Sequence, residues 1–349
     1  MGVNEAFRSS QWEASYGRIR LQPALYQDDI ERMVSSLQAA QAGNTFLSSL
    51  MESKLLSFNT EKSICLVVGK DEDANQMRTH LTNQPLKLCG KPMKNVMQYT
   101  YLGEELHELG VAASAEATIN KRYGKVKQLI FEIKSILEDC RLNTVGGAST
   151  GLDLWEMSIV PFLYFSSECW VELKKESLKK LKELHLLFYR CLLGCPSTTP
   201  SASLFWFLGQ LLPENKVIER KLLFLFHVAN LPIQTVARQI YEEQRKLGIG
   251  GLVSECRTFL AQINVRESLI KTASKSQWKS IIRSGILEKN RYEVLEMCKG
   301  LKKVDYFQLK NEDFELKEYF KTLSLKQSRT LFSIKTNMVN AKMNYMSDP

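Results

Sequence analysis

Closely spaced metal ligands and targeting segments are both missing from this chain of 349 residues. It has only four histidines, and its eight cysteines contain no CxxC pair. Structural zinc sites need closely spaced Cys and His ligands, so no such site is expected, and scattered cysteines are typical of reduced intracellular thiols. The start, MGVNEAFRSSQW, lacks the apolar core of a signal peptide, and no apolar run approaches a membrane span. The sequence predicts a nuclear or cytoplasmic protein without membrane contact.

Acidic residues are also fewer than basic ones. The net charge is +9, and residues 266–349 carry seven of these charges, with 17 Lys or Arg against 10 Asp or Glu. Such an excess favours an anionic partner, of which nucleic acid is the leading candidate. The hydrophobic content of 44% is ordinary for a globular protein, and the length suffices for one large or two ordinary domains.

Short strand patterns dominate the first hundred residues. GRIRLQ (17–22) alternates polar and apolar residues, and IERMV (30–34) does so again after two aspartates. This pattern predicts a hairpin with Asp28 and Asp29 at its tip, beside a buried strand at 63–69. A helix is expected from Ser35 as its N-cap. A polar helix at 71–82 and small antiparallel strands within 86–103 follow.

Helical patterns take over beyond residue 112. A long amphipathic helix is predicted at 114–140 with Ser114 as a candidate cap, and VGGASTG (145–151) is predicted to be a loop. The segment before Gly194 has an apolar stripe opposite lysines, and Gly194 is expected to stop that helix. Further helices are predicted at 214–229, 233–247 and 252–263. The fold class is therefore α+β, predominantly α.

Five segments in a fixed order resemble a known family. They are YQDD (26–29), FNTEKSICLVVG (58–69), YTYLGEEL (99–106), INKRYGKVKQ (119–128) and IVPFLYFSSECW (159–170). Together they resemble the end of the palm and the thumb in reverse transcriptases of non-LTR, LINE-type retrotransposons. The resemblance covers roughly residues 17–230 and implies RNA-directed DNA polymerase ancestry.

This resemblance implies three parts and a set of partners. Residues 1–110 would be a small antiparallel palm remnant, 111–230 an all-helical thumb and 231–349 a basic helical extension. The implied partner is a duplex of RNA template and DNA primer, together with the upstream part of the element.

The resemblance also assigns Asp28 and Asp29 as catalytic ligands of Mg²⁺. Two-metal nucleotidyl transfer needs carboxylates that converge on both ions, and Mg²⁺ prefers oxygen ligands. The alternative is that both aspartates are ordinary turn residues. The family also uses an upstream palm Asp, whereas residues 1–25 contain only Glu5 and Glu13 as acids. The chain alone is therefore expected to be inactive, and a nucleic-acid-binding or interaction protein without catalysis is the alternative function.

The remaining site assignments each have a structural alternative. Lys62 resembles the family's nucleotide-binding lysine, or is an exposed residue at a strand start. The primer-grip segment Tyr101, Leu102 and Gly103 is alternatively a core aromatic before a tight turn.

Four cations on one predicted helix are assigned to nucleic-acid phosphates, with a solvated helix face as the alternative. They are Lys121, Arg122, Lys125 and Lys127. Three tryptophans in apolar segments, Trp155, Trp170 and Trp206, are expected in the core. His185 has no ligand-type partner at suitable spacing and is given no chemistry.

Overall fold

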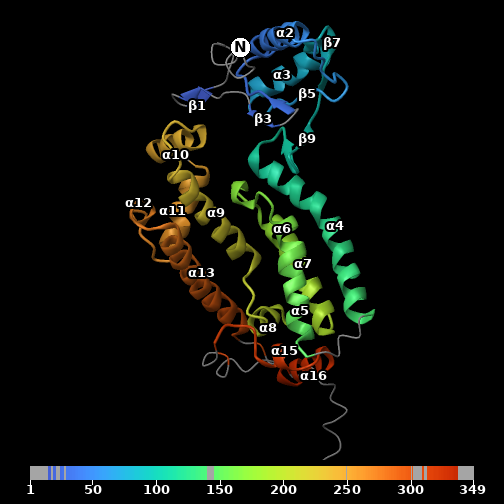
Figure 1. The fold of residues 1–349 in the computed structure, drawn as a ribbon, viewed down its shortest axis with the longest axis vertical. Coiled ribbons are helices and arrows are strands. Elements are labelled where there is room, and N and C mark those ends of the chain that lie inside the picture. Colours follow the sequence, from blue (N-terminus) through green and yellow to red (C-terminus); the bar gives the residue numbers. More distant parts are fainter. Residues whose placement is uncertain are drawn as a thin grey trace, which may run out of the picture. The chain divides into compact units, whose positions relative to one another are not determined.

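Helices predominate in the structure of this protein, a computed structural model (Figure 1). It describes residues 30–139, 145–248, 250–299, 301, 309 and 313–336, and the backbone of strand segments at 15–16, 19–20, 24–26 and 29. The chain divides into two compact units. Unit 1 comprises Met1–Ala117 and His227–Ser254, and unit 2 comprises Thr118–Phe226 and Glu255–Pro349. The strands are few and short, which confirms the predicted class of α+β, predominantly α.

The described strands of unit 1 form two-stranded ladders. Four are antiparallel: β1 (Ser15–Tyr16) with β2 (Ile19–Arg20), β3 (Ala24–Tyr26) with β4 (Asp29–Glu31), β6 (Lys87–Leu88) with β7 (Lys91–Pro92), and β9 (Gln98–Tyr101) with β10 (Glu104–His107). The predicted small antiparallel strands are thereby confirmed. The strand expected at 63–69 is only β5 (Ile64–Cys65), and it runs parallel to β8 (Lys94–Asn95). The hairpin β3–β4 therefore does not pair with it.

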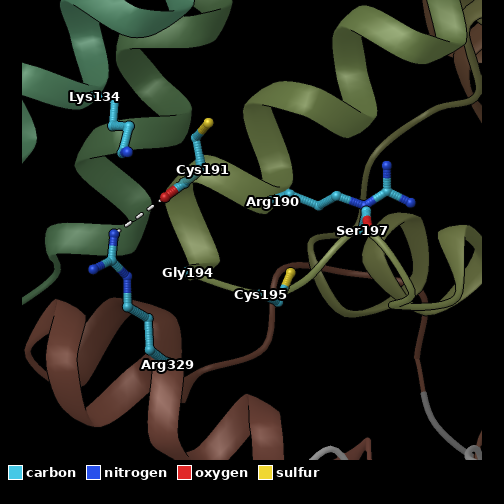
Figure 2. Close-up of a pocket in the computed structure, with 7 residues that line it drawn as sticks. All are labelled: Lys134, Arg190, Cys191, Gly194, Cys195, Ser197 and Arg329. Atoms are coloured by element: carbon cyan, nitrogen blue, oxygen red, sulfur yellow. Dashed lines mark hydrogen bonds between the residues drawn. The ribbon is translucent and has the colours of Figure 1, made fainter.

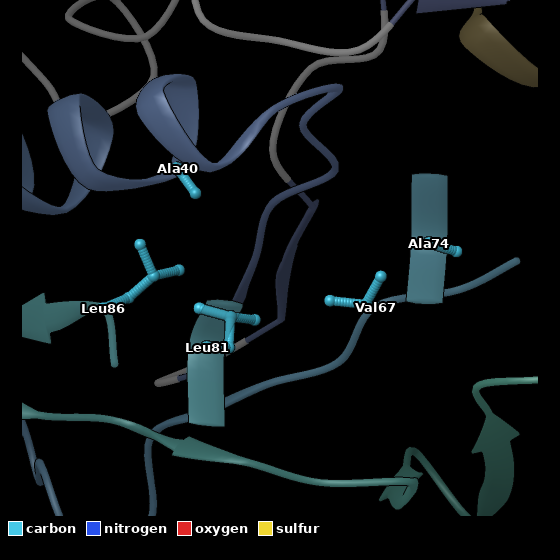
Figure 3. Close-up of a cluster of buried hydrophobic side chains, with 5 residues drawn as sticks. All are labelled: Ala40, Val67, Ala74, Leu81 and Leu86. Atoms are coloured by element: carbon cyan, nitrogen blue, oxygen red, sulfur yellow. The ribbon is translucent and has the colours of Figure 1, made fainter. Parts of the chain in front are cut away.

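Two helices build the hydrophobic core of unit 1. α2 (Leu37–Ser53) is capped by Ser36, one residue after the predicted cap. α3 (Glu72–Asn83) confirms the predicted polar helix and is capped by Asp71. Between them lies the cluster of Ala40, Val67, Ala74, Leu81 and Leu86 (Figure 3). α10 (Val236–Leu247) also belongs to this unit.

One arginine joins three segments of unit 1. The Arg78 guanidinium on α3 donates from Nη2 to the carbonyl oxygens of Val67 (3.2 Å), Gly69 (2.5 Å) and Glu108 (3.2 Å). Its Nε lies 3.0 Å from the Glu108 carboxylate. Hydrogen bonds of a charged donor to partly buried carbonyls are worth more than neutral ones, so Arg78 stabilises the chain on both sides of the core.

Unit 2 consists almost entirely of helices. They include α4 (Val111–Asp139), α5 (Gly147–Leu154), α6 (Val160–Leu163), α7 (Lys175–Leu193), α8 (Ser201–Phe207), α9 (Pro213–Ala229), α11 (Leu252–Gln262), α12 (Leu269–Thr272), α13 (Lys275–Cys298), α15 (Tyr319–Thr322) and α16 (Leu325–Lys335). α4 and α11 each begin in unit 1, and α9 ends there. The predicted helices that correspond to α7, α9, α10 and α11 are confirmed, and Gly194 ends α7 in the left-handed conformation.

The start of α4 differs from the prediction. Ser114 is not its cap, because the helix already begins at Val111. The Ser114 hydroxyl instead accepts from the backbone N–H of His107 (2.9 Å) and donates to the Gly110 carbonyl (3.0 Å). The serine therefore links the end of β10 to the first turn of the helix.

The predicted loop at 145–151 is wrong over most of its length. α5 begins at Gly147 and is mostly buried. A Cβ placed on Gly151 would lie 2.4 Å from Leu192 Cδ1. Close packing against α7 therefore favours a helix in a segment whose Gly, Ser and Thr content indicates a loop.

The three tryptophans predicted in the core are there: Trp155, Trp170 and Trp206 are 0%, 2% and 0% exposed. Trp155 stacks on Phe188 with ring centroids 4.6 Å apart. It begins a π-helical turn, Trp155–Ile159, directly before α6. Pro161 in the first turn of α6 has no N–H to donate to the preceding turn, and that turn has the widened π-helical form.

The basic C-terminal segment is integral to unit 2. On α13, Trp278 donates its indole N–H to the Leu222 carbonyl of α9 at 3.0 Å. The buried Asn290 accepts from the Leu212 N–H (2.7 Å) and from Asn215 Nδ2 (2.9 Å). These bonds satisfy buried polar groups on both helices, so α13 and α9 depend on each other. Residues 255–349 therefore group with 118–226 rather than forming a third unit.

Gly209→Ala should destabilise the protein by about 2 kcal/mol or more. Gly209 has a φ of +59°, and an added Cβ would lie 2.5 Å from the backbone at Glu315 and Leu316. Gly124→Ala is the matched control, since its Cβ would meet nothing within 4 Å. In the middle of a helix this change should stabilise by about 0.5–1 kcal/mol. Urea denaturation measures both, and a similar loss in the two variants would contradict the assignment.

Candidate nucleic-acid interface

An antiparallel hairpin is present where the sequence predicted one, but Asp29 belongs to strand β4 and not to the tip. Tyr26 pairs with Asp29, and Ala24 pairs with Glu31. Asp28 lies outside the described residues, and of Asp29 only the backbone position on β4 is described. Their role as Mg²⁺ ligands stays a prediction.

Residues that follow the hairpin attach it to α2. Arg32 donates to the Asn44 side chain and to the Ala39 carbonyl, both at 3.4 Å. Its guanidinium covers Gly43, where an added Cβ would come within 1.8 Å of the Arg32 side chain. Glu31, which the sequence analysis did not single out, is half-buried, and burial raises the pKa of its carboxyl.

Lys62 and the primer-grip segment occupy turns of unit 1. Lys62 is exposed, and its backbone N–H bonds to Asn59 just before β5. Leu102 and Gly103 join β9 to β10 with φ angles of 47° and 85°. Two positive φ angles in a two-residue connection define a type I′ hairpin turn, and Gly103 suits it. The tight turn is confirmed, whereas the roles of Lys62 and of Tyr101, Leu102 and Gly103 toward a nucleotide or primer stay predictions.

The assignment of Arg122 to nucleic-acid phosphates is corrected by its position in the structure. Its side chain is only 5% exposed. Nη1 donates to the carbonyl of Phe165 (2.8 Å) and lies 3.4 Å from that of Leu163, at the end of α6. Helix ends leave carbonyls without intrahelical partners, and Arg122 satisfies them. Arg122 therefore anchors α4 to α6 and does not contact phosphates.

The remaining three cations of this segment lie on or beside the exposed face of α4. Lys121 and Lys125 are exposed, and Lys127 is half-exposed with its Nζ 5.4 Å from the centre of the Tyr123 ring. No acidic residue occurs from 117 to 131. A group of exposed cations on one helix contributes a positive potential that attracts polyanions.

Gly124 lies at the centre of this face. It is exposed, in the middle of a helix of 29 residues, and no atom lies within 4 Å of an added Cβ. Glycine in a helix interior costs roughly 0.5–1 kcal/mol relative to alanine. Nothing in the described packing requires this glycine, in contrast to Gly151 and Gly209. We name the surface of Lys121, Gly124, Lys125 and Lys127 the α4 face.

One edge of the α4 face is bordered by α7. Lys180 Nζ donates to Asn120 Oδ1 at 2.5 Å, and the Tyr123 hydroxyl donates to Glu183 Oε2 at 3.1 Å. These contacts hold the two helices side by side. They also place one carboxylate at this edge, which limits the positive surface in that direction.

His185 has a structural role that its sequence context did not indicate. It is completely buried on α7 between two tyrosine hydroxyls, at 2.8 Å from Tyr164 and 2.9 Å from Tyr189. The Tyr189 hydroxyl donates to Gln210, so it accepts from Nδ1–H, and Tyr164 donates to Nε2. A neutral imidazole satisfies this arrangement. Burial, reinforced by the positive charge of Lys216, lowers the pKa of His185 well below 6.5.

A shallow hollow of about 370 Å³ lies at the C-terminal end of α7 (Figure 2). Its basic lining residues are Lys134, Arg190 and Arg329. Arg329 donates to the carbonyls of Leu192 (2.9 Å) and Cys191 (3.1 Å). Cations at a helix C-terminus satisfy its last carbonyls and its dipole, so these contacts attach α16 to α7.

The described residues also bear on the predictions for metals and membranes. No group of three or more His, Cys, Asp or Glu there is arranged to hold a metal ion. Within the same residues, every helix is too short or too polar to cross a bilayer.

Comparison with known proteins gave no match to a family model, a curated protein or a solved structure. The resemblance to reverse transcriptases therefore rests on the order of the five sequence segments.

Because of His185, the free energy of unfolding should decrease as the pH is lowered below about 6.5. The unfolded state binds a proton there and the folded state does not, so up to about 1.4 kcal/mol is lost per pH unit. Above this pH both states are neutral and the effect vanishes. His185→Gln should remove this dependence, although it also lowers stability at pH 7.5.

Urea denaturation at several pH values between 5 and 7.5 measures the difference between the native chain and the variant. His80→Gln, at an exposed position, is the matched control for loss of one histidine. Parallel curves for the native chain and His185→Gln would contradict the buried neutral histidine.

Proposed function

We propose that this chain is a nucleic-acid-binding protein of reverse-transcriptase descent, and that unit 2 contacts the sugar-phosphate backbone of a duplex through the α4 face. The observation that carries this proposal is Gly124, an exposed mid-helix glycine among lysines with open space above it. The order of the five sequence segments supports the descent, and it assigns this helix to the thumb.

The charge of the α4 face suits phosphates rather than a specific base sequence. Lys121 and Lys125 are one helical turn apart, so both project from the same side of α4. Lysine carries a strongly hydrated point charge on a long stem, which adapts to phosphates in several positions. Contacts of this kind position a duplex without reading its sequence.

Gly124 allows a backbone to approach the helix closely. A side chain at this position would project between the lysines and hold a bound strand away from the helix surface. Glycine residues are used where a ligand backbone comes near the protein backbone. Gly124 lowers the stability of α4, and no described contact inside the protein requires a glycine there. This is consistent with a role in close approach of a ligand backbone.

Replacing Lys121, Lys125 and Lys127 together by Ala should weaken the salt dependence of duplex binding. The logarithm of the association constant falls with the logarithm of salt at a slope of roughly −0.9 per phosphate contact. Three contacts predict a slope of about −3, which the triple variant should reduce in size by about 2 to 3. Fluorescence anisotropy of a labelled duplex over a salt series measures this.

The matched control removes three exposed lysines from the C-terminal segment, which carries most of the net charge. They are Lys271, Lys275 and Lys279. Substitution is preferable to truncation, because α13 and α16 are packed into unit 2. An equal reduction of the slope in the control would show that overall charge, not the α4 face, governs binding.

Gly124→Ala should weaken duplex binding without lowering the stability of the protein.

A second candidate function, RNA-directed DNA polymerase, is favoured by the antiparallel β3–β4 hairpin. In that case Asp28 and Asp29 would hold Mg²⁺, which stabilises the attacking and leaving oxygens in nucleotidyl transfer. The chain's own contribution would be to present adjacent carboxylates at a hairpin attached to α2 through Arg32.

Primer extension on an RNA template separates the two functions. Binding through the α4 face predicts no nucleotide addition by this chain, since lysine–phosphate contacts supply no carboxylates for transfer. The polymerase function predicts addition that requires Mg²⁺, stops in EDTA and is abolished by Asp28→Ala. Asp28→Ala should leave duplex affinity within about twofold, because additivity is expected for independent sites.

A further inference from the structure

Exposed apolar side chains occur in the segment that Arg122 joins to α4. Met157, Phe162 and Phe165 are 78%, 41% and 52% exposed, and all belong to the π turn, α6 and the turn that follows it. Scattered exposed apolar residues are ordinary, but two aromatic rings three positions apart beside a basic surface are a specific combination.

Phe165 is held in place from the α4 side. Arg122 donates to the Phe165 carbonyl at 2.8 Å, and its guanidinium carbon lies 5.7 Å from the centre of the Phe165 ring. The next residue, Ser166, has a φ of 59°, and the Ser167 N–H bonds to the Tyr164 carbonyl (3.1 Å), so Phe165 sits on a tight turn. The ring is thus fixed at its base and half open to solvent.

The α4 face and the Phe165 ring lie on adjoining sides of α4. Lys125 follows Arg122 by three positions, and residues at this spacing neighbour each other on a helix surface. Lys121 directly precedes Arg122 in the sequence. A cationic surface and an exposed aromatic ring therefore adjoin, with the buried Arg122 between them.

We propose that Phe165, assisted by Phe162, is a stacking platform for unpaired bases of a nucleic-acid strand whose phosphates lie on Lys121 and Lys125. The proposal rests on the proposed phosphate-binding role of the α4 face and extends it from duplex to a single-stranded segment. Every base has an aromatic face, so stacking on a fixed ring tolerates any sequence, while the lysines hold the backbone.

Charge complementarity decides between a nucleic acid and a protein partner for this surface. An apolar protein surface would bury the rings but would supply no negative charge to the adjoining lysines. A single strand supplies an apolar face and a phosphate for each nucleotide, which matches an exposed aromatic ring beside a basic helix surface. Interior base pairs of a duplex are stacked on both faces, and only the outer face of each terminal pair is open, so a duplex offers Phe165 far fewer stacking sites than a single strand does.

The test compares affinities of the full chain for a single-stranded oligonucleotide and for a blunt duplex of equal length, at one salt concentration. Phe165→Ala should weaken single-strand binding by roughly 5- to 100-fold, the effect of losing one base stack. Duplex affinity should change by less than about twofold, because the lysines remain and Arg122 can still donate to the main-chain carbonyl of residue 165. Phe165→Trp should preserve single-strand binding, and its indole fluorescence should be quenched on binding.

Met157→Ala is the control for loss of exposed apolar surface, and thermal denaturation checks that each variant is folded. Equal loss for single strand and duplex would mean that Phe165 acts through the fold, and the proposal would fail. Unchanged single-strand affinity in Phe165→Ala would also overturn it and leave a protein contact as the use of the rings. If duplex binding persists in that case, the proposed function stands alone. If the native chain binds neither nucleic acid, both proposals fail.

Discussion

The buried guanidinium of Arg122 is the constraint on which the arrangement of the candidate interface depends. A buried cation is tolerated only when acceptors surround it, and here they are carbonyls after α6 together with the rings of Phe165 and Trp170. Satisfying them fixes the rotation of α4 about its own axis. Because successive residues are about 100° apart, this rotation directs Lys121 and Lys125 to the surface and places Gly124 between them. The same contact holds Phe165 at the border of the α4 face.

Buried polar groups inside unit 2 form hydrogen bonds that connect further helices to one another. His185 links Tyr164, at the end of α6, to Tyr189 on α7, and every hydroxyl and ring nitrogen in the set has a partner. Asn290 and Trp278 do the same between α13 and α9. Buried networks of this kind favour one packing over its alternatives when they are fully satisfied. The segment after α6 that presents Phe165 is consequently supported by residues from distant parts of the sequence, including the basic C-terminal helices.

Unit 1 contributes a different kind of element. Its hairpins and short ladders surround a small core, and Arg78 joins the segments on either side of that core. The β3–β4 hairpin and the β9–β10 turn are the parts that the reverse-transcriptase resemblance assigns to chemistry and to the primer. The residues of the α4 face belong to unit 2 and both of these parts belong to unit 1. The proposed nucleic-acid binding and the proposed catalysis can therefore be tested separately.

The sequence by itself determined the features that depend on neighbours along the chain. The apolar stripe of α7, its stop at Gly194, the cap of α3 at Asp71 and the turn at Leu102 and Gly103 follow from local periodicity, capping and turn preferences. Tertiary structure decided the rest. Four cations within seven residues surround α4 on several sides, and only carbonyls more than forty positions away determine that Arg122 is the one turned inward. Likewise, Gly147–Leu154 is a helix because Gly151 packs on Leu192, and the partners of His185 come from separate elements. Contacts between residues far apart in sequence leave no local pattern, so they are set only when the chain folds.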